Sequence, residues 1–154
     1  MLTELCQELR NWFFVEGVTG RFVIEDGQLT DCSFLQNGQY FRIIGSVFND
    51  GVHQYQPDYV PAEGETPDLA DETFDGTIWA MAVPPSVIAL SEQIDAWNAK
   101  YGTVDSQAMS PYNSESFGGY SYSKSGGGSG SGSSSPTATW QSMFASALNR
   151  WRKI

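Results

Sequence analysis

Residues 40–55 read YFRIIGSVFNDGVHQY, a stretch with the composition of a β-hairpin. The run 40–48 is rich in aromatic and β-branched residues, which favour strands. It is followed by Asn49-Asp50-Gly51, and these residue types adopt the positive φ values of hairpin turns at little energetic cost. VHQY at 52–55 then predicts the returning strand. The stretch indicates that the chain contains antiparallel β-structure.

Two further runs on either side predict strands of the same sheet. RFVIED at 21–26 closes on the turn residues Asp26-Gly27, and TIWAMAV at 77–83 follows Asp75-Gly76. The intervening sequence at 56–72, QPDYVPAEGETPDLADE, has three prolines and many acids, so it predicts an exposed loop. The region from about 21 to 83 is therefore expected to be an antiparallel sheet or a small barrel.

Three segments show apolar residues at helical spacing: 3–13, 86–102 and 139–154. Thr3 and Thr139 are candidate caps for the first and third helices. Glycines at 17 and 20 are expected to end the first segment, and Gly102 the second. The apolar stripes are Leu5, Leu9, Trp12 and Phe13; Val87, Leu90, Ile94, Trp97 and Tyr101; and Trp140, Phe144, Ala147, Leu148 and Trp151.

These segments predict an α+β fold, because helices and strands do not alternate as in a parallel α/β sheet. We expect a small helical bundle with an inserted antiparallel sheet or small barrel, and a protruding strand or hairpin before a Gly/Ser tether. The predicted organisation is a single body over 1–125, a flexible linker at 126–135 and a C-terminal amphipathic docking helix at 136–154.

The segment at 111–124, PYNSESFGGYSYSK, alternates like a short strand but has no hydrophobic partner beside it in the sequence. A strand without a partner is a candidate for edge pairing with another chain. The following residues, GGGSGSGSSS at 126–135, form a coil that spans roughly 16–19 Å. The helix beyond them therefore need not pack on its own core, and it suits docking into a groove, with Trp140, Phe144 and Trp151 as anchors.

The net charge of −10 is unevenly distributed. Residues 50–75 hold eight acids and no Lys or Arg, whereas the last fifteen residues hold Arg150, Arg152 and Lys153 and no acid. An acidic body disfavours wrapping nucleic acid through its phosphates. The asymmetry fits packing against charge-complementary neighbours. It also fits a solubilising acidic loop and a basic helix end that complements the helix dipole.

The sequence gives little support for catalysis. Cys6 and Cys32 lack metal-like spacing, His53 is the single histidine, and no nucleophile elbow, zinc-protease or phosphate-loop motif is present. Asp68, Asp71, Glu72 and Asp75 are candidates for a hard cation, but a solvated acidic loop is the ordinary interpretation. We expect a non-enzymatic protein with no cofactor and no bound metal.

Residues 1–15 lack the basic start and apolar run of a signal peptide, and the longest apolar stretches are too short to span a bilayer. We therefore expect a soluble protein that does not associate with membranes.

The order of the C-terminal segments carries a family resemblance. SESFGGYSYS at 114–123, between the helix predicted at 86–102 and a final basic helix, resembles the "SExxGxYSxxY"-like strand of head–tail connector (adaptor, or head-completion) proteins of long-tailed bacteriophages. FLQNGQYFRIIGSVFNDGV at 34–52 and ETFDGTIWAMAVPP at 72–85 also resemble small neck-region proteins of phages that infect Gram-positive bacteria. The likeness is strongest over about 84–154.

The resemblance implies a structural virion protein of the phage neck, assembled in the host cytoplasm. It implies a ring of twelve copies between the portal protein and the tail or stopper proteins. Such a ring extends the channel through which genomic DNA passes without specific binding, and it offers a docking surface to the tail. The contact residues that the resemblance carries over are Glu115, Phe117, Gly118, Tyr120 and Tyr122, together with Trp140, Phe144, Leu148, Arg150, Trp151, Arg152 and Lys153.

Three other functions stay open at the level of sequence. One is a tail-completion or tail-terminator protein of the same neck region, in which the β-rich half makes the ring contacts. Another is a host-surface carbohydrate-binding module that uses Tyr55, Tyr59 and Tyr112. A metal-dependent enzyme built on the acidic loop comes last.

Overall fold

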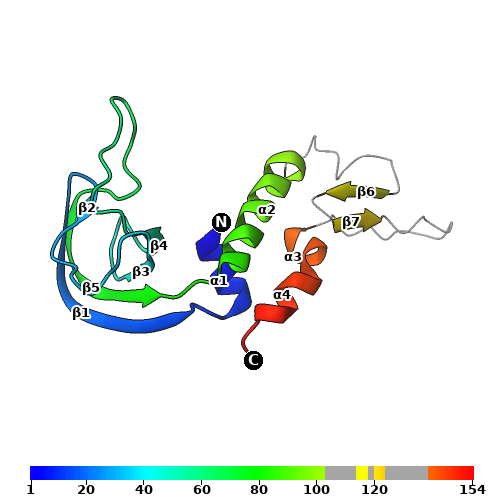
Figure 1. Cartoon of the computed structure of the whole chain (residues 1–154), viewed down its shortest axis with the longest axis horizontal. Helices are drawn as coiled ribbons and strands as arrows, with labels where there is room; N and C mark the ends of the chain where they lie inside the picture. Colours follow the sequence, from blue (N-terminus) through cyan, green and yellow to red (C-terminus); the bar gives the residue numbers. More distant parts are fainter. Residues whose placement is uncertain (103–113, 118–119, 124–138) are drawn as a thin grey trace. The chain divides into compact units, whose positions relative to one another are not determined.

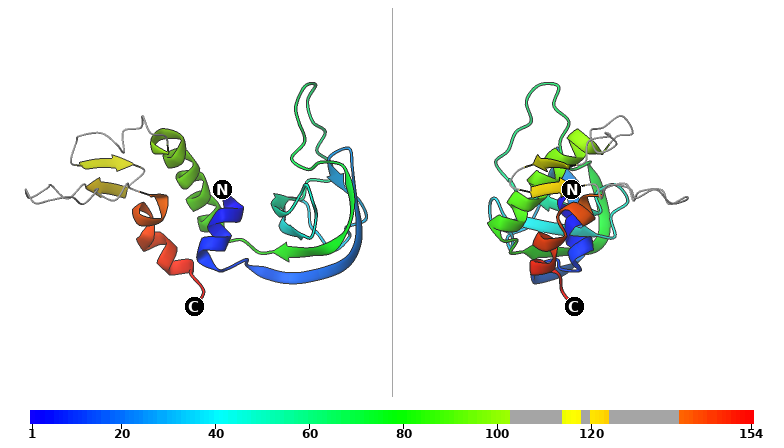
Figure 2. Two further views of the ribbon diagram at one scale, coloured as in Figure 1. Left: turned by 180° about the vertical axis from the view of Figure 1, so that it is seen from behind. Right: turned by 90° about the vertical axis from the view of Figure 1, so that its right-hand side faces the viewer.

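The computed structural model describes residues 1–102, 114–117, 120–123 and 139–154. Its contacts divide the chain into two compact units. Residues 11–84 form one, called here the sheet unit, and residues 3–10 and 85–154 form the other, called the helical unit. Figures 1 and 2 show the elements of each unit. The fold is α+β, as predicted, and consists of a curled five-stranded antiparallel sheet with a few helices.

The sheet has the strand order β2-β1-β5-β3-β4. Its strands are β1 (Phe14–Glu25), β2 (Gln28–Leu29), β3 (Tyr40–Ile44), β4 (Gly51–Gln54) and β5 (Glu72–Met81). The long central strands β1 and β5 bend strongly, so the sheet curls around its core (Figure 1). The core residues of this unit are Phe22, Ile24, Leu29, Cys32, Leu35, Phe41, Ile43, Leu69, Phe74, Ile78 and Ala80.

On the face of β1 and β5 that points away from the core, the register of the two strands places polar side chains next to each other. Thr19 pairs with Thr77, and their hydroxyl oxygens lie 2.8 Å apart. Arg21 pairs with Asp75, and its guanidinium donates two 3.1 Å hydrogen bonds to the carboxylate. Side chains of successive residues point to opposite faces of a strand, so alternate residues of each strand line the core.

The sequence predicted four of the five strands, missed β2, and misplaced several strand ends; β5, for example, begins at Glu72 rather than at 77. β1 starts at Phe14 rather than at 21, and Gly17 and Gly20 lie within it instead of ending a helix. The first half of β1 is largely exposed, so it lacks the alternating burial that marks a strand in a sequence. The strand exists there because its backbone pairs with β5. Asp26-Gly27 forms the predicted turn, with φ values of 52° and 72°.

The hairpin predicted at 40–55 is present, but the prediction of a tight turn at Asn49-Asp50-Gly51 is wrong. β3 ends at Ile44, and its register with β4 pairs Ile43 with Gly51. Gly45, with φ of 94°, starts a six-residue loop over 45–50. Asn49-Asp50-Gly51 is therefore not a tight hairpin turn. The loop is held by tertiary hydrogen bonds, described below, that no local pattern shows.

The helical unit contains α1 (Leu2–Leu9), α2 (Pro85–Tyr101), α3 (Trp140–Met143) and α4 (Ala145–Trp151). The buried side chains of α2 include the whole predicted stripe from Val87 to Tyr101. The helices are few and mostly short, so the expected helical bundle is not clearly formed.

Two predicted helices differ from the structure. α1 ends at Leu9, because Arg10 has a left-handed φ of 50°, and its N-cap is Met1 rather than Thr3. The helix predicted over 139–154 is interrupted at Phe144 into α3 and α4. Its predicted cap is confirmed, since the Thr139 hydroxyl accepts a hydrogen bond from the Ser142 backbone N–H.

The segment at 114–123 is a hairpin rather than a lone strand. β6 (Ser114–Phe117) pairs antiparallel with β7 (Tyr120–Ser123), with Phe117 opposite Tyr120. The partner that the sequence seemed to lack is thus the second half of the same motif. The Gly/Ser linker predicted at 126–135 lies outside the described residues.

Candidate functional site

The acidic run that closes the long loop of the sheet unit is divided among four different partners. One oxygen of Asp68 lies 2.6 Å from Nδ1 of His53, and Asp71 accepts a 2.9 Å hydrogen bond from the Gly27 backbone N–H. Glu72 binds the 45–50 loop, and Asp75 binds Arg21. The four carboxylates therefore make separate contacts and do not converge on one point. Among the described residues, no three His, Cys, Asp or Glu side chains gather as a metal site.

Glu72 anchors the 45–50 loop through several donors at once. Its carboxylate accepts hydrogen bonds from the Ser46 hydroxyl, the Val47 backbone N–H at 3.0 Å and the Asn49 side-chain amide at 3.0 Å. The Ser46 hydrogen bond in particular lowers the pKa of Glu72. Each of these hydrogen bonds favours the charged form of the carboxylate. Together they tie Ser46, Val47 and Asn49 of the loop to one side chain.

Asn49 joins the same loop to the long 55–71 loop. Its side chain is buried, donates to the Ala70 carbonyl at 2.9 Å and accepts from the Ala70 N–H at 2.7 Å. Its own carbonyl oxygen lies 2.8 Å from Nε2 of His53. No contact of His53 was predicted from the sequence, whereas the structure places its ring nitrogens next to Asn49 and Asp68. The two loops therefore form one hydrogen-bonded block.

This block presents apolar side chains to solvent. Val47 is 81% exposed and Phe48 is 72% exposed, and Tyr59 and Val60 on the long loop are also exposed. Exposed aromatic and aliphatic side chains on a rigid support are typical of surfaces that bind another molecule. The exposure of Val47 and Phe48 was not predicted from the sequence, because 40–48 was interpreted as one continuous strand. The signal for the break is Gly45.

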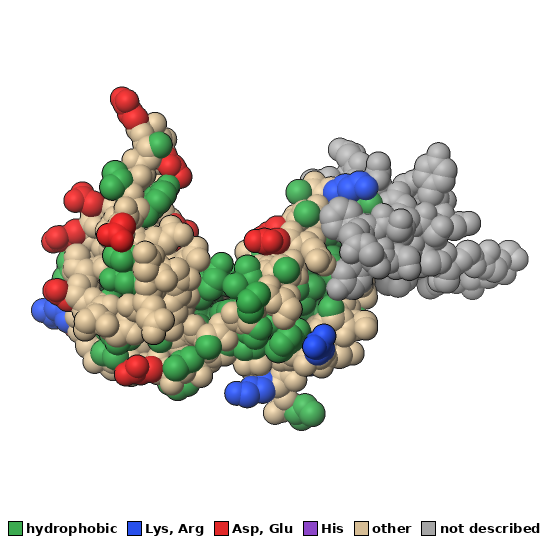
Figure 3. Space-filling view, in the orientation of Figure 1, with side chains coloured by type: hydrophobic (Ala, Val, Ile, Leu, Met, Phe, Trp, Pro, Cys, Tyr) green, Lys and Arg blue, Asp and Glu red, His purple; other side chains and the backbone are tan. Residues whose placement is uncertain are grey.

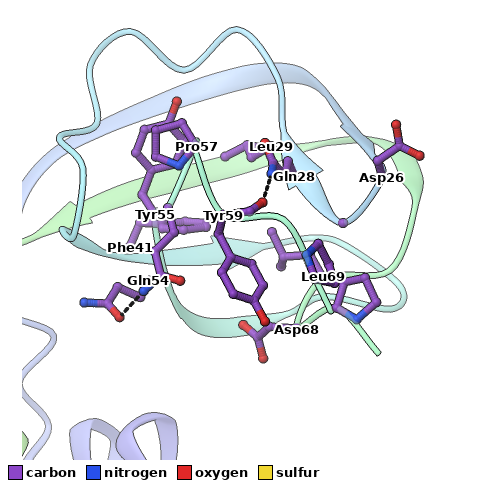
Figure 4. A pocket seen from close by; sticks show the side chains of 14 residues that line it. Asp26, Gln28, Leu29, Phe41, Gln54, Tyr55, Pro57, Tyr59, Asp68 and Leu69 are labelled. Atoms are coloured by element: carbon purple, nitrogen blue, oxygen red, sulfur yellow. Dashed lines mark hydrogen bonds between the residues drawn. The ribbon is translucent and has the colours of Figure 1, made fainter. Parts of the chain in front are cut away.

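A small pocket opens beside this block, within the sheet unit (Figure 4). Its volume is about 80 Å³. We call it the aromatic pocket, because Phe41, Tyr55 and Tyr59 are among its lining residues. Tyr55 packs edge-on against Phe41, with ring centroids 6.4 Å apart. Figure 4 labels Tyr59, Asp68 and Asp26 among the side chains that line the pocket.

Polar contacts brace the walls of the aromatic pocket. The Gln28 side-chain amide donates to the Tyr59 carbonyl, and the Gln56 amide donates to the Gln54 side chain at 2.9 Å (Figure 4). The Tyr59 hydroxyl donates to Glu65, which raises the pKa of Tyr59 and lowers that of Glu65. A pocket braced in this way is present before any partner arrives.

The sheet unit carries the charge of the whole chain. Residues 11–84 contain twelve Asp and Glu and two Arg, a net charge of −10, whereas the remaining residues contain six of each sign. Figure 3 shows acidic side chains on the loops of the sheet unit. Arg21 is paired with Asp75, and Arg42 lies between Trp12 and Trp79. Most of the carboxylates in this unit are therefore not neutralised by its own arginines.

The structure separates the predicted contact residues of the final helix into two groups. Phe144 and Leu148 are buried within the chain, so they hold α4 in place. Arg150 and Lys153 are exposed, and the Arg150 guanidinium lies 5.5 Å from the centroid of the Trp151 ring. Arg152 pairs with Glu8 of α1, and the Lys153 backbone N–H donates to the Leu9 carbonyl at 2.9 Å. Trp140 and Trp151 are partly buried.

The predicted contact residues of the motif occupy the β6–β7 hairpin. Glu115 pairs with Tyr122 across the strands, and Phe117 pairs with Tyr120. Gly118 lies outside the described residues, as does Tyr112 of the carbohydrate-binding alternative. Of the other two tyrosines of that alternative, Tyr55 packs against the core residue Phe41 and Tyr59 is exposed. Tyr55 and Tyr59 both line the aromatic pocket, and the place of Tyr112 relative to them is outside the described residues.

Comparisons with protein families, with curated proteins and with solved structures find no match to this chain. Within the part of the chain that the structure describes, no helix is long and apolar enough to cross a membrane.

Proposed function

We propose that the protein is a structural component of the phage neck, a head–tail connector that forms a ring between the portal and the tail. The observation that carries the proposal is the order of the C-terminal elements: α2, the β6–β7 hairpin at the SESFGGYSYS motif, and the helices α3 and α4, with basic residues in and just after the last turn of α4. This order matches the resemblance described above. The proposed partners are the portal protein, a tail or stopper protein, and further copies of the chain.

The described geometry supports a role in assembly. Val47, Phe48, Tyr59 and Val60 are exposed apolar side chains on the two hydrogen-bonded loops, as in protein interfaces. The charge distribution favours contact between unlike surfaces of neighbouring copies. Acidic side chains facing a channel would repel DNA and let it slide without specific binding. Mapping of the 50–75 acids to the outside of an assembled ring would contradict this last point.

Portal capture is the experiment that tests the proposal. The doubly substituted variant Tyr120→Ser/Tyr122→Ser should lose co-purification with the portal protein of the same phage, because the motif supplies that contact. Val15→Ser, a change to an exposed side chain of β1 outside the aromatic pocket, is the control and should keep it. Undiminished capture by the motif variant, with an unchanged fold by circular dichroism, would contradict the proposed portal contact.

A tail-terminator function is the second candidate. The observation that favours it is that the sheet unit, which carries all of the net charge, is built from β-structure. This alternative predicts capture by the tail-tube protein in place of the portal protein. The two baits can be compared in the same experiment.

A further inference from the structure

We propose that the aromatic pocket of the sheet unit receives a basic side chain from the end of α4, Arg150 or Lys153, of a second copy of this chain. The contact is head-to-tail, and it deepens the proposed ring by naming the surfaces that meet. Its first support is the size of the pocket. A volume of about 80 Å³ suits the end of one side chain, and a larger, more open hollow of about 690 Å³ that shares Pro67, Asp68 and Leu69 with the pocket adjoins it.

The chemistry of the pocket selects a basic side chain. Aromatic rings attract cations through their faces and also cover the alkyl stem of Lys or Arg. Asp68 lines the same pocket, and its side chain is 77% exposed although one oxygen binds His53. A carboxylate at the rim pairs with an incoming cation, and the Gln54 and Gln56 side chains offer further acceptors.

The charges of the two units indicate where the cation comes from. The sheet unit has an excess of ten carboxylates, and neither of its arginines is available, since one is ion-paired and the other lies between two tryptophans. The end of α4 presents Arg150 and Lys153 as exposed cations with no acid in the last fifteen residues. Two surfaces of opposite charge on one chain favour association between copies.

The end of α4 is held in a way that suits docking. Arg152 and the Lys153 backbone bind α1, so they fix the direction of the chain there. The Arg150 guanidinium lies over Trp151, which limits the conformational entropy that this side chain would lose on binding. The exposed Phe48, beside the pocket on the block held by Glu72, supplies apolar area around the charged contact.

A contact between unlike surfaces has a definite consequence for assembly. Each copy keeps one free pocket and one free basic end after pairing, so association continues into a ring or an open chain. A self-complementary contact would instead stop at the dimer. The two kinds of interface can therefore be told apart by which pairs of variants associate.

The test is self-association of the full chain, measured by sedimentation velocity. One variant carries Asp68→Lys in the pocket, and a second carries Arg150→Gln/Lys153→Gln at the basic end. Each variant alone should associate at least about tenfold more weakly than the unsubstituted protein. An equimolar mixture should form a heterodimer and nothing larger, because it contains one intact pocket and one intact basic end.

Two matched controls separate this contact from general charge effects. Glu16→Lys makes the same charge reversal on an exposed part of β1 outside the pocket and should leave association unchanged. Asp68→Asn removes the charge but keeps an acceptor for His53, so it should weaken association while the thermal midpoint stays unchanged. Equal weakening by Glu16→Lys would overturn the proposal.

Two further outcomes would also overturn it. One is an unsubstituted chain that stays monomeric up to about 1 mM, a concentration at which even weak contacts are populated. The other is a mixture that remains monomeric while each variant is folded. If Asp68→Lys lost portal capture without any change in self-association, the occupant of the pocket would be the portal rather than a second copy.

The two proposals fail separately. Loss of the head-to-tail contact would leave capture of the portal by the β6–β7 motif intact. Conversely, a chain that associates head-to-tail but captures neither the portal nor the tail-tube protein would retain this inference and lose the neck function.

Discussion

The guanidinium carbon of Arg42 lies 3.6 Å from the centroid of the Trp12 ring. The ring of Trp79, which pairs with Arg42 across β3 and β5, lies 5.1 Å away on the same guanidinium. Nε of Arg42 is buried and has no hydrogen-bond partner among the described residues. Two aromatic faces therefore take over part of the stabilisation that a hydrogen-bond acceptor would give this cation.

Arg42→Gln is expected to lower the free energy of unfolding by about 1–2 kcal/mol, because it removes the cation–π contacts with both tryptophans. Arg21→Gln is the matched control. It breaks an exposed ion pair with Asp75, and it should cost clearly less. Urea unfolding followed by tryptophan fluorescence measures both. Equal losses in the two variants would show that the tryptophan contacts contribute nothing beyond an exposed ion pair.

Gly76→Ala should destabilise the sheet unit by at least about 2 kcal/mol, since an added Cβ would lie 2.3 Å from the Ile44 carbonyl oxygen and force β3 away from β5. Gly20→Ala is an unusually close control, because Gly20 pairs with Gly76 in the register of β1 and β5. An added Cβ at Gly20 meets nothing within 4 Å. Its effect should stay within about 0.5 kcal/mol. Comparable losses at the two glycines would contradict the close approach of the Ile44 carbonyl to Gly76.

Glu72 should make the stability of the sheet unit depend on pH. Hydrogen bonds lower the pKa of Glu72 below its usual 4.5, and the bond from Ser46 has the largest effect. A lowered folded pKa means that the group stabilises the protein above its unfolded pKa, and that this contribution is lost as pH falls through the folded value. The pKa values of Asp75 and Glu65 are also lowered, so these two groups add to the stability that is lost as the pH falls.

Glu72→Gln should therefore lower the urea midpoint at neutral pH and approach the unsubstituted protein in acid. The measurement is the urea midpoint as a function of pH. The corresponding change at the exposed Glu16 should leave the profile parallel to that of the unsubstituted protein. A constant gap between Glu72→Gln and the unsubstituted chain at all pH values would show that the carboxylate charge is not what holds the loop.

The two cysteines should report on the two units separately. Cys32 is buried in the sheet unit, and burial, with the nearby charge of Asp31, raises the pKa of its thiol to about 11. Cys6 is buried in the helical unit. Both should resist a thiol reagent at about pH 8, because both thiols are buried and the raised pKa of Cys32 also makes its reactive thiolate scarce.

Single-cysteine variants make this measurable. In the Cys6→Ala background, Gly76→Ala should speed the labelling of Cys32, because it opens the sheet unit. In the Cys32→Ala background, the same glycine change should leave the labelling of Cys6 unaltered. Equal acceleration of both thiols would mean that the two units unfold as one.

Several features of this protein follow from local sequence alone. The stripe from Val87 to Tyr101, with prolines before it and Gly102 after it, predicted α2 because helical spacing and helix ends are encoded within a few residues. The Asp26-Gly27 turn and the Thr139 cap were equally local. The α+β class followed from the order of these elements.

Only the tertiary structure decided where long-range partners meet. β1 extends back to Phe14 because β5 supplies its hydrogen bonds, and the 45–50 loop departs from a simple hairpin because Glu72, more than twenty residues away, holds it. The aromatic pocket combines residues from 26 to 69 that share no sequence pattern. Backbone pairing and side-chain hydrogen bonds between distant segments depend on the closed fold, so the sequence determined the elements and the fold determined the site.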